Sequence, residues 1–308
     1  MYESVLVPLD GSPSAELAVP IAQGIARRTN GSVHLVHVHV PLSSAGAPRS
    51  ASMPFYGDWD VEAKEQEEGY LRALRQRLTP LPTVTVDHRV EEGSVVETLA
   101  RCGEELRAEL VVMTTHGRGP LARAWLGSVA DGLARRSSIP VLLVRPTADP
   151  EPMGEHLFRN ILVALDGSEL AEQVLAHATG LGTLVGAHYT LVRVVSPLLL
   201  TGYAPTPEGM LTEAAYGPEL ELLIEDAEGY LEVVAKGLRA RGLTVETQVV
   251  AEMQPAVGIL EFAREKAADL IAMATHGRTG FSRLLLGSVA DKVLRGTSAP
   301  VLLYRPDA

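Results

Sequence analysis

The chain has 308 residues, of which 46% are hydrophobic and 21% are charged, as is typical of a folded globular protein rather than a disordered one. Its 27 basic and 38 acidic residues give a net charge of −11, which argues against binding nucleic acid or anionic membranes through overall charge. No apolar run is long enough to span a membrane, and a single cysteine excludes an internal disulfide, so we expect a cytoplasmic protein.

The sequence repeats itself once. Residues 5–16 (VLVPLDGSPSAE) and 161–172 (ILVALDGSELAE) are identical at 8 of 12 positions, and residues 115–146 and 275–306 are identical at 19 of 32. Self-similarity on this scale indicates a duplicated domain rather than a chance motif. The sequence therefore predicts three parts, which are a first domain (1–146), a proline-rich linker (147–156) and a second domain (157–308).

Strand and helix patterns alternate within each copy. In the first copy, the apolar run 4–9 predicts a strand buried on both faces, and Ser12-Pro13 predicts the start of a helix that continues to about Arg28. Later patterns predict strands at 33–40, 83–90, 109–115 and 139–145, and helices near 58–78, 94–108 and 126–136. The second copy follows the same plan, so we predict an α/β fold of two tandem, doubly wound domains, each with an open five-stranded parallel sheet.

The segments most alike between the copies follow the first and fourth predicted strands. Asp10-Gly11-Ser12 and residues 166–168 follow the first strand, and THGR segments at 115–118 and 275–278 follow the fourth. Each THGR segment leads to a Gly-Ser pair that opens a helix. Open parallel sheets bind ligands at the carboxyl ends of their strands, and a helix N-terminus offers N–H donors to a phosphate. Neither a Walker motif nor a dinucleotide-binding glycine motif is present, so any phosphate cradle here is of another type.

Each of these residues also has an interpretation that needs no ligand. The two aspartates can simply form turns or caps, and the Gly-Ser pairs can be plain helix starts. His116 and His276 can act as catalytic bases, but a loop histidine more often bonds to the backbone. Arg118 and Arg278 can contact phosphate or only solvent. We predict binding roles for the aspartates and the Gly-Ser pairs, and no catalytic residue.

Three histidines, a cysteine and a charged helix face are the remaining polar features. His37 and His39 should face the same side of a strand with His34 nearby, but the second copy has no histidine in the matching stretch 191–195, which argues against a metal site. Cys102 is expected to be a small buried residue rather than a reactive thiol. The charged side chains of the helix near 58–78 are expected to form i,i+4 pairs on a solvated surface and are Glu67, Glu68, Arg72 and Arg75.

The spacing of a glycine, nine residues and then Gly-Ser resembles the universal stress protein family, and both halves match over nearly their full length. The resemblance implies the universal stress protein fold, similar to that of adenine-nucleotide α-hydrolases, with one adenosine-and-phosphate site in each domain. In the first domain it implies that the site comprises Pro8, Asp10 at the ribose, Val38 at adenine, Met113, Thr114, His116, Gly117, Arg118, Gly127, Ser128 and Val129. In the second domain the corresponding residues are Ala164, Asp166, Val194, Met273, Ala274, His276, Gly277, Arg278, Gly287, Ser288 and Val289.

One departure from the family pattern occurs twice. The first motif glycine of the family is Thr114 here and Ala274 in the second copy, and a Cβ at that position narrows the approach of the backbone to phosphates. Because Thr114 is the bulkier of the two, we expect the first site to bind more weakly. The resemblance implies an ATP-binding stress sensor or regulatory module, with Mg²⁺ as a companion of the phosphates and at most weak ATP hydrolysis.

Two other functions remain as alternatives. A slow ATP hydrolase or phosphotransfer enzyme would need Ser128, Ser288 and the loop arginines to act in chemistry. The second alternative is a protein-interaction module that binds no nucleotide. The resemblance also implies edge-to-edge pairing through the last strand of each domain, and a homodimer of the whole chain is a further hypothesis.

Overall fold

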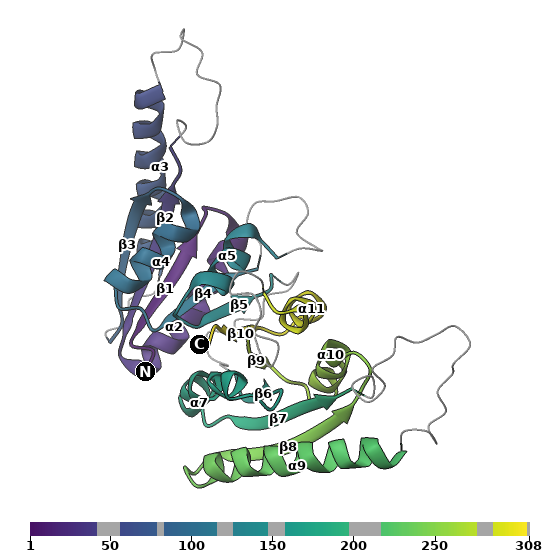
Figure 1. The fold of residues 1–308 in the computed structure, drawn as a ribbon. Helices are drawn as coiled ribbons and strands as arrows, with labels where there is room; N and C mark the ends of the chain where they lie inside the picture. Colours follow the sequence, from purple (N-terminus) through teal and green to yellow (C-terminus); the bar gives the residue numbers. More distant parts are fainter. Residues whose placement is uncertain are drawn as a thin grey trace, which may run out of the picture. The chain divides into compact units, whose positions relative to one another are not determined.

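The computed structural model describes residues 1–41, 56–78, 83–115, 126–146, 158–196, 217–275 and 286–306. The chain divides into two compact units, Met1–Leu157 and Phe158–Ala308, each of which holds one copy of the sequence repeat. Each unit contains five parallel strands with helices packed on them, so the predicted α/β class and the tandem, doubly wound arrangement are confirmed (Figure 1).

The two units have matching elements. The first contains β1 (Ser4–Leu9), α1 (Pro13–Glu16), α2 (Ala18–Thr29), β2 (Ser32–His39), α3 (Tyr56–Arg77), β3 (Thr85–Glu92), α4 (Val95–Glu105), β4 (Leu110–Thr114), α5 (Ser128–Arg136) and β5 (Val141–Val144). The second contains β6 (Asn160–Ala164), α6 (Glu169–Glu172), α7 (Val174–Thr183), β7 (His188–Val195), α9 (Gly217–Arg239), β8 (Thr244–Ala251), α10 (Pro255–Glu265), β9 (Leu270–Ala274), α11 (Ser288–Gly296) and β10 (Val301–Tyr304).

The strand order of each unit reverses at one point. In the first unit the order is β3-β2-β1-β4-β5, and Val5 of β1 lies opposite Leu110 of β4. In the second unit the order is β8-β7-β6-β9-β10, and Ile161 of β6 lies opposite Leu270 of β9. The chain moves outward from the first strand to the third and then returns to the other side of the first. The switch points therefore lie between β1 and β4 and between β6 and β9.

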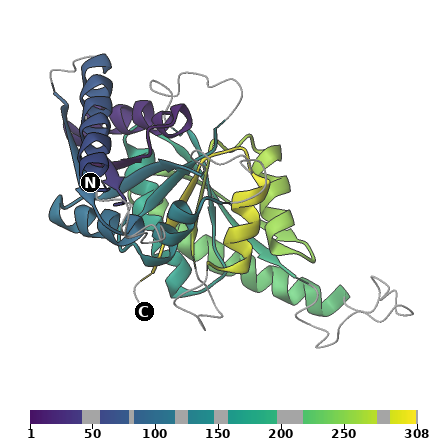
Figure 2. The ribbon, with the colours of Figure 1, turned by 90° about the horizontal axis from the view of Figure 1, so that it is seen from above.

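Helices cover both faces of the strands in each unit. In β7, Arg193 pairs with Asp226 of α9, whereas its neighbour Val194 packs against Gly258 of α10. Successive strand residues point to opposite faces, so α9 and α10 lie on opposite faces. Helix α11 shares the face of α10, and the two helices lie side by side in both views (Figure 1 and Figure 2). In the first unit, α4 and α5 pack together in the same way.

The helix predicted after Ser12 differs in one respect from the structure. It begins as predicted but is interrupted at Leu17, which separates α1 from α2. Pro20 has no N–H to donate to the carbonyl of Glu16, which removes one helical hydrogen bond at this place. Gln173 separates α6 from α7 in the same way although no proline follows, so proline is not required for the interruption.

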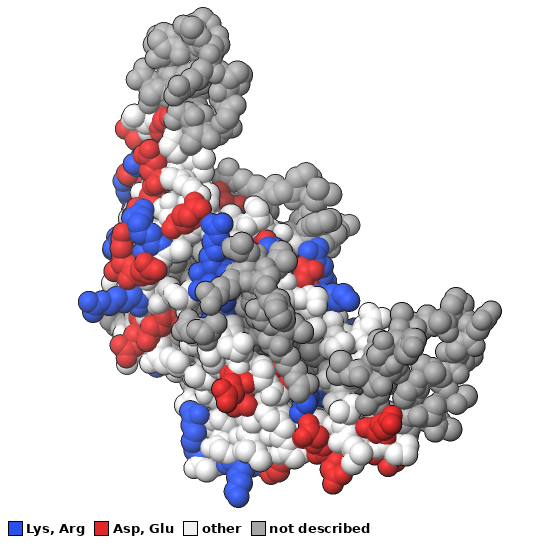
Figure 3. All heavy atoms as spheres, viewed as in Figure 1, with Lys and Arg blue, Asp and Glu red and all other residues white. Residues whose placement is uncertain are grey.

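Charges of both signs are interspersed on the face of the molecule that Figure 3 shows. Several belong to helical i,i+4 pairs, such as Arg135 with Asp131 at 2.7 Å and Arg295 with Asp291 at 2.8 Å. Within the ranges that the structure describes, no helix is both long and apolar enough to cross a membrane.

Candidate functional site

A tight turn follows the first strand of the first unit. The N–H and the hydroxyl of Ser12 both donate to Asp10 Oδ1, at 2.9 Å and 2.6 Å. Ser12 Oγ also accepts from the N–H of Ala15 at 3.2 Å and thereby caps α1. Gly11 has a φ of 80°, a conformation that favours glycine. The Asp10 carboxylate is therefore fixed at the carboxyl edge of the sheet by its own turn, without help from a ligand.

The second unit repeats this turn almost atom for atom. Ser168 donates to Asp166 Oδ1 from its N–H at 3.0 Å and from its hydroxyl at 2.6 Å, and its Oγ caps α6 by accepting from Ala171 at 3.2 Å. Gly167 has a φ of 87°. Both aspartates therefore form turns, as one of the two interpretations predicted, and the helix caps are the serines that follow them.

The start of the last helix returns to the same edge of the sheet. The N–H of Gly127 donates to the carbonyl of Thr115 at 2.8 Å, and the N–H of Gly287 donates to Thr275 at 2.9 Å. Because Val5 lies opposite Leu110 in parallel strands, the residues five positions further on, Asp10 and Thr115, leave the sheet at the same edge. The Asp-Gly-Ser turn and the Gly-Ser helix start therefore both lie at the carboxyl edge of the sheet, where β1 and β4 form the switch point.

Backbone packing alone explains the glycine at this helix start. A Cβ built on Gly287 would collide with the carbonyl oxygen of Thr275, the same oxygen that accepts the Gly287 N–H. The first bond inside α11 runs from the N–H of Asp291 to Gly287, so the N–H groups of residues 288–290 have no partner within the helix. The helix start thus combines a packing requirement with a set of donors suited to an anion.

The predicted site residues fall into three groups. Residues at the sheet edge with partly or fully exposed surface are Asp10, Val38, Gly127, Ser128, Val129, Asp166, Val194, Ala274, Gly287, Ser288 and Val289. Those buried in the strands are Pro8, Met113, Thr114, Ala164 and Met273. The remaining ones lie outside the described residues and are His116, Gly117, Arg118, His276, Gly277 and Arg278.

A buried arginine that the sequence did not single out lies under the turn of the second unit. The guanidinium carbon of Arg193 is 3.1 Å from where a Cβ on Gly167 would be, and 5.3 Å from the ring centre of Tyr230. Its Nη1 is 3.4 Å from Asp226 Oδ2. Burial raises the pKa of Tyr230, and Glu172 and Asp166 raise it further, whereas Arg193 opposes this. A cation and a neutral phenol therefore adjoin the Asp-Gly-Ser turn.

The predicted histidine cluster divides between the two faces of β2. His37 and His39 share one face, as predicted, where Glu67 Oε1 lies 3.3 Å from His37 Nε2 and Glu67 Oε2 lies 3.0 Å from His39 Nδ1. The side chain of His34 instead bonds to Asp87 at 2.8 Å and to Ser4 at 3.1 Å. No three histidine, cysteine or acidic side chains in the described ranges are arranged to hold a metal ion.

The prediction of a solvated surface was wrong for Glu67 and right for its neighbour. Glu68 pairs with Arg72 at 4.0 Å and both are exposed, as expected. Glu67 is rotated about 100° around the helix from Glu68, which turns it toward the two histidines of the sheet. Cys102 is fully buried, and burial raises its pKa, as expected of an unreactive thiol.

Comparison with known proteins identifies the family. The sequence profile of the Universal stress protein family matches residues 1–145 and again residues 157–305. The chain belongs to the universal stress protein family. A universal stress protein of Mycolicibacterium smegmatis is 28% identical over 305 residues, covering 98% of this chain and 97% of the relative. One from Methanocaldococcus jannaschii is 34% identical over 154 residues, covering 49% of this chain and 85% of the relative.

A solved structure agrees with the fold of the whole chain. The crystal structure of a universal stress protein from Archaeoglobus fulgidus superimposes with a TM-score of 0.66 at 20% identity, covering 98% of this chain and 96% of that chain. At this identity the likeness establishes the fold. Two universal stress protein domains in tandem are therefore shown by profile, relatives and fold together.

Proposed function

We propose that each domain binds one adenine nucleotide, ATP, at its switch point, and that the chain acts as a sensor or regulatory module in a stress response. The observation that carries the proposal is the duplicated meeting of two features at one sheet edge. One is a carboxylate fixed in its turn, as in Asp10 and Asp166. The other is a helix start whose N–H groups suit phosphate, at Ser128 and Ser288.

The roles of the residues follow from their chemistry. Asp10 and Asp166 would accept hydrogen bonds from ribose hydroxyls, since a carboxylate is an acceptor and a ribose hydroxyl is a donor. Val38 and Val194 present partly exposed apolar surface in the neighbouring strand, which suits the face of adenine. The backbone N–H groups of Ser128 and its neighbours would hold phosphate oxygens, with Mg²⁺ as the ion that accompanies the phosphates. An acidic chain can bind ATP in this way because backbone donors need no net positive charge.

We further propose binding without rapid turnover, and at most weak ATP hydrolysis. Phosphoryl transfer needs a positioned nucleophile or base and a stabilised leaving group. The carboxylate at this site accepts two hydrogen bonds on one oxygen from its own turn, which suits a fixed acceptor better than a base that must exchange protons. This fixed carboxylate is consistent with a regulatory nucleotide that stays bound without being hydrolysed.

The sharpest test replaces the charge of each aspartate and keeps its turn. In Asp10→Asn, the amide oxygen can still accept both bonds from Ser12, while the other group becomes a donor that cannot accept from ribose. Calorimetric titration with ATP should show two sites per chain, of which Asp10→Asn removes one and Asp166→Asn removes the other. Asp269→Asn is the control, because Asp269 lies beside the start of β6, at the opposite end of the strand; its two oxygens accept from Arg159 and Asn160, so the amide loses one of these bonds and the urea midpoint of this variant is measured alongside.

The outcomes separate the three candidate functions. Loss of one site in each variant and of none in the control supports nucleotide binding. No heat at millimolar ATP, and no nucleotide released from the denatured natural protein, would refute it and leave the interaction module. Steady ADP production faster than one turnover per minute, abolished in the double aspartate variant, would favour the enzyme instead.

A further inference from the structure

A buried guanidinium lies beneath the Asp-Gly-Ser turn of the second domain, and the proposed nucleotide roles leave it unused. Arg193 follows Val192 in β7, and the carbonyl of Val192 accepts the N–H of Leu165, just before Asp166. The guanidinium carbon is 3.1 Å from where a Cβ on Gly167 would be, and the side chain is only 8% exposed. A guanidinium does not lose its proton in proteins, so a permanent positive charge adjoins this turn.

The contacts of Arg193 neutralise this charge only in part. Asp226 Oδ2 lies 3.4 Å from its Nη1, but that side chain is 71% exposed, so water screens the carboxylate far more than it screens the buried cation. The other neighbour is the neutral ring of Tyr230, whose centre is 5.3 Å away. Asp166 and Glu172 also interact with Tyr230 from the side of the turn. These two carboxylates repel phosphates, and Arg193 offsets that repulsion.

The first domain repeats the phenol and the two carboxylates, but its arginine is in a different place. Asp10 and Glu16 interact with Tyr70 in the same way. The nearest arginine is Arg77 at the end of α3, which lies 2.7 Å from Glu16. The side chain of Arg77 is 61% exposed, so its charge is screened by solvent, unlike that of Arg193.

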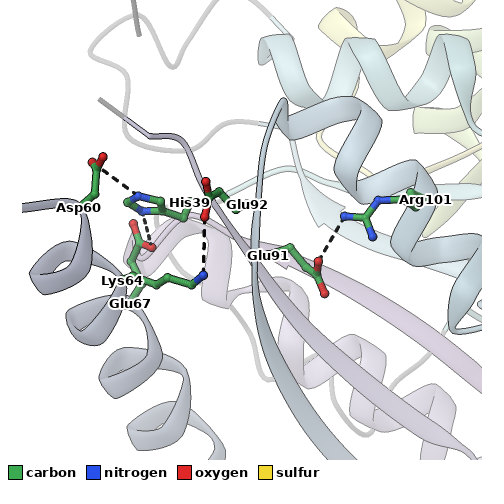
Figure 4. A network of polar contacts seen from close by, with 7 residues as sticks. All are labelled: His39, Asp60, Lys64, Glu67, Glu91, Glu92 and Arg101. Atoms are coloured by element: carbon green, nitrogen blue, oxygen red, sulfur yellow. Dashed lines mark hydrogen bonds and ion pairs between the residues drawn. The ribbon is translucent and has the colours of Figure 1, made fainter. Parts of the chain in front are cut away.

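No permanent cation occupies the position of Arg193 in the first domain. The matching residue of β2 is His37, beside the turn. Glu67 of α3 reaches the same place, with Oε1 3.3 Å from His37 Nε2 and Oε2 3.0 Å from His39 Nδ1 (Figure 4). In α9 the residue that matches Glu67 is the buried Ala227, which has no charge. The pair of a buried guanidinium and a surface carboxylate is thus specific to the second domain.

We propose that Arg193 strengthens the binding of phosphorylated nucleotides by the second domain through its charge, and that Asp226 moderates this effect from the surface. The inference rests on the proposed nucleotide function of that site. ATP is a polyanion, so a fixed positive charge beneath the turn stabilises its complex. Adenosine has no charge and gains nothing from Arg193. The pair therefore sets how strongly the second site prefers ATP over the bare nucleoside, and the first site has no equivalent of it.

The test changes each charge of the pair separately and measures both ligands. Asp10→Asn leaves only the second site, and this protein is titrated with ATP and with adenosine at an ionic strength of about 10 mM, where charges act over about 30 Å. Arg193→Gln should weaken ATP binding about three- to tenfold, as one unit charge within about 10 Å of a polyanion predicts. Asp226→Asn should strengthen ATP binding about two- to threefold. The affinity for adenosine should stay within about twofold in both variants.

The opposite signs distinguish a charge effect from a packing effect. If Arg193 only supports the turn, breaking its ion pair in Asp226→Asn does not strengthen ATP binding, and Arg193→Gln weakens ATP and adenosine equally.

Glu225→Gln is the matched control, because it removes the same charge one position earlier on α9, turned about 100° away from Asp226, and should have a smaller effect. ATP binding by the second site that Asp226→Asn leaves unchanged or weakens would overturn the inference and leave the proposed function intact. Absence of ATP binding by the natural protein would overturn the proposed function. Asp226 is exposed, so its variant decides the matter even where urea midpoints show that Arg193→Gln fails to fold.

Discussion

Replacing Gly287 with alanine should destabilise the second domain, although the change adds a single methyl group. The new Cβ would collide with the carbonyl oxygen of Thr275. That oxygen also accepts the N–H of Gly287 at 2.9 Å, so the start of α11 cannot move away without losing this hydrogen bond. The neighbouring atoms belong to backbone rather than to a flexible side chain, and no rotamer change relieves the collision.

The size of the effect follows from two terms. Overpacking of a well-packed site costs about 1–3 kcal/mol, and loss of the hydrogen bond costs about 1 kcal/mol. The free energy of unfolding should therefore fall by about 2–4 kcal/mol. Gly237→Ala provides the matched control, because Gly237 lies within α9 and a Cβ there meets no atom within 4 Å. The same methyl group should raise the free energy of unfolding by about 0.5–1 kcal/mol at that position.

Urea unfolding followed by circular dichroism measures both variants. With a slope of about 2 kcal/mol per molar urea, Gly287→Ala should lower the midpoint of the second domain by about 1–2 M, while Gly237→Ala should raise it slightly. Equal midpoints for the two variants would refute the packing explanation of Gly287. In that case packing would not explain the glycine, and the proposed nucleotide site would be the remaining reason for it. The result also bears on binding experiments, since bulky substitutions of this glycine would confuse lost folding with lost affinity.

Three further predictions concern local contacts. Ser12→Ala removes the α1 cap and the bonds of that hydroxyl to Asp10 and Ser14, so the free energy of unfolding should fall by about 1 kcal/mol, and an unchanged urea midpoint would contradict this. Burial raises the pKa of Asp87, but the hydrogen bond and charge of His34, together with the charges of Arg89 and Arg75, outweigh it and lower that pKa overall. The stability that this pair contributes is therefore present above the unfolded value of about 3.9 and is lost as the pH falls through the lower folded value. Below about pH 4, the free energy of unfolding should fall less steeply with decreasing pH in Asp87→Asn than in the natural protein. An equal dependence on pH in the two proteins would show that this pair contributes no stability. Burial raises the pKa of Cys102, so a thiol reagent should modify the native protein at least about tenfold more slowly than the unfolded chain, and equal rates would exclude this.

The sequence was sufficient to predict the elements and their order. Apolar runs such as 4–9 identified strands buried on both faces, and Ser12-Pro13 identified a helix start, because these signals depend on residues close together in the chain. Because the domain is duplicated, the pattern that predicts each element occurs in both copies. Alternation of strand and helix then fixed a parallel sheet, since parallel neighbours need a crossover between them. The sequence also placed Asp10 and the Gly-Ser helix start after strands of that sheet, but the position of the switch point between β1 and β4 came from the structure.

The sequence alone also indicated that the aspartates and the Gly-Ser pairs have a particular role, but it did not show whether that role is in packing or in binding. A glycine that lets a phosphate approach the backbone and a glycine that lets a carbonyl oxygen approach it cannot be distinguished in a single sequence. Only the packing of Gly287 against Thr275 shows that the second requirement exists. The same holds for the aspartates, because a carboxylate at this position suits both a turn and a ribose. Only the structure shows that Ser12 and Ser168 donate hydrogen bonds to these carboxylates.

Tertiary structure alone decided which charged residues face one another. Glu67 and Glu68 are equivalent in a helical pattern, and the choice between solvent and the histidines depends on the rotation of α3 against the sheet. In the sequence Arg193 is one more strand residue, and only the structure places Gly167 and Tyr230 beside it. Length, composition and local pattern determined two acidic, duplicated α/β domains. The charge beneath each proposed site was decided only by contacts between residues far apart in the chain, because local patterns do not encode which helix face meets which strand.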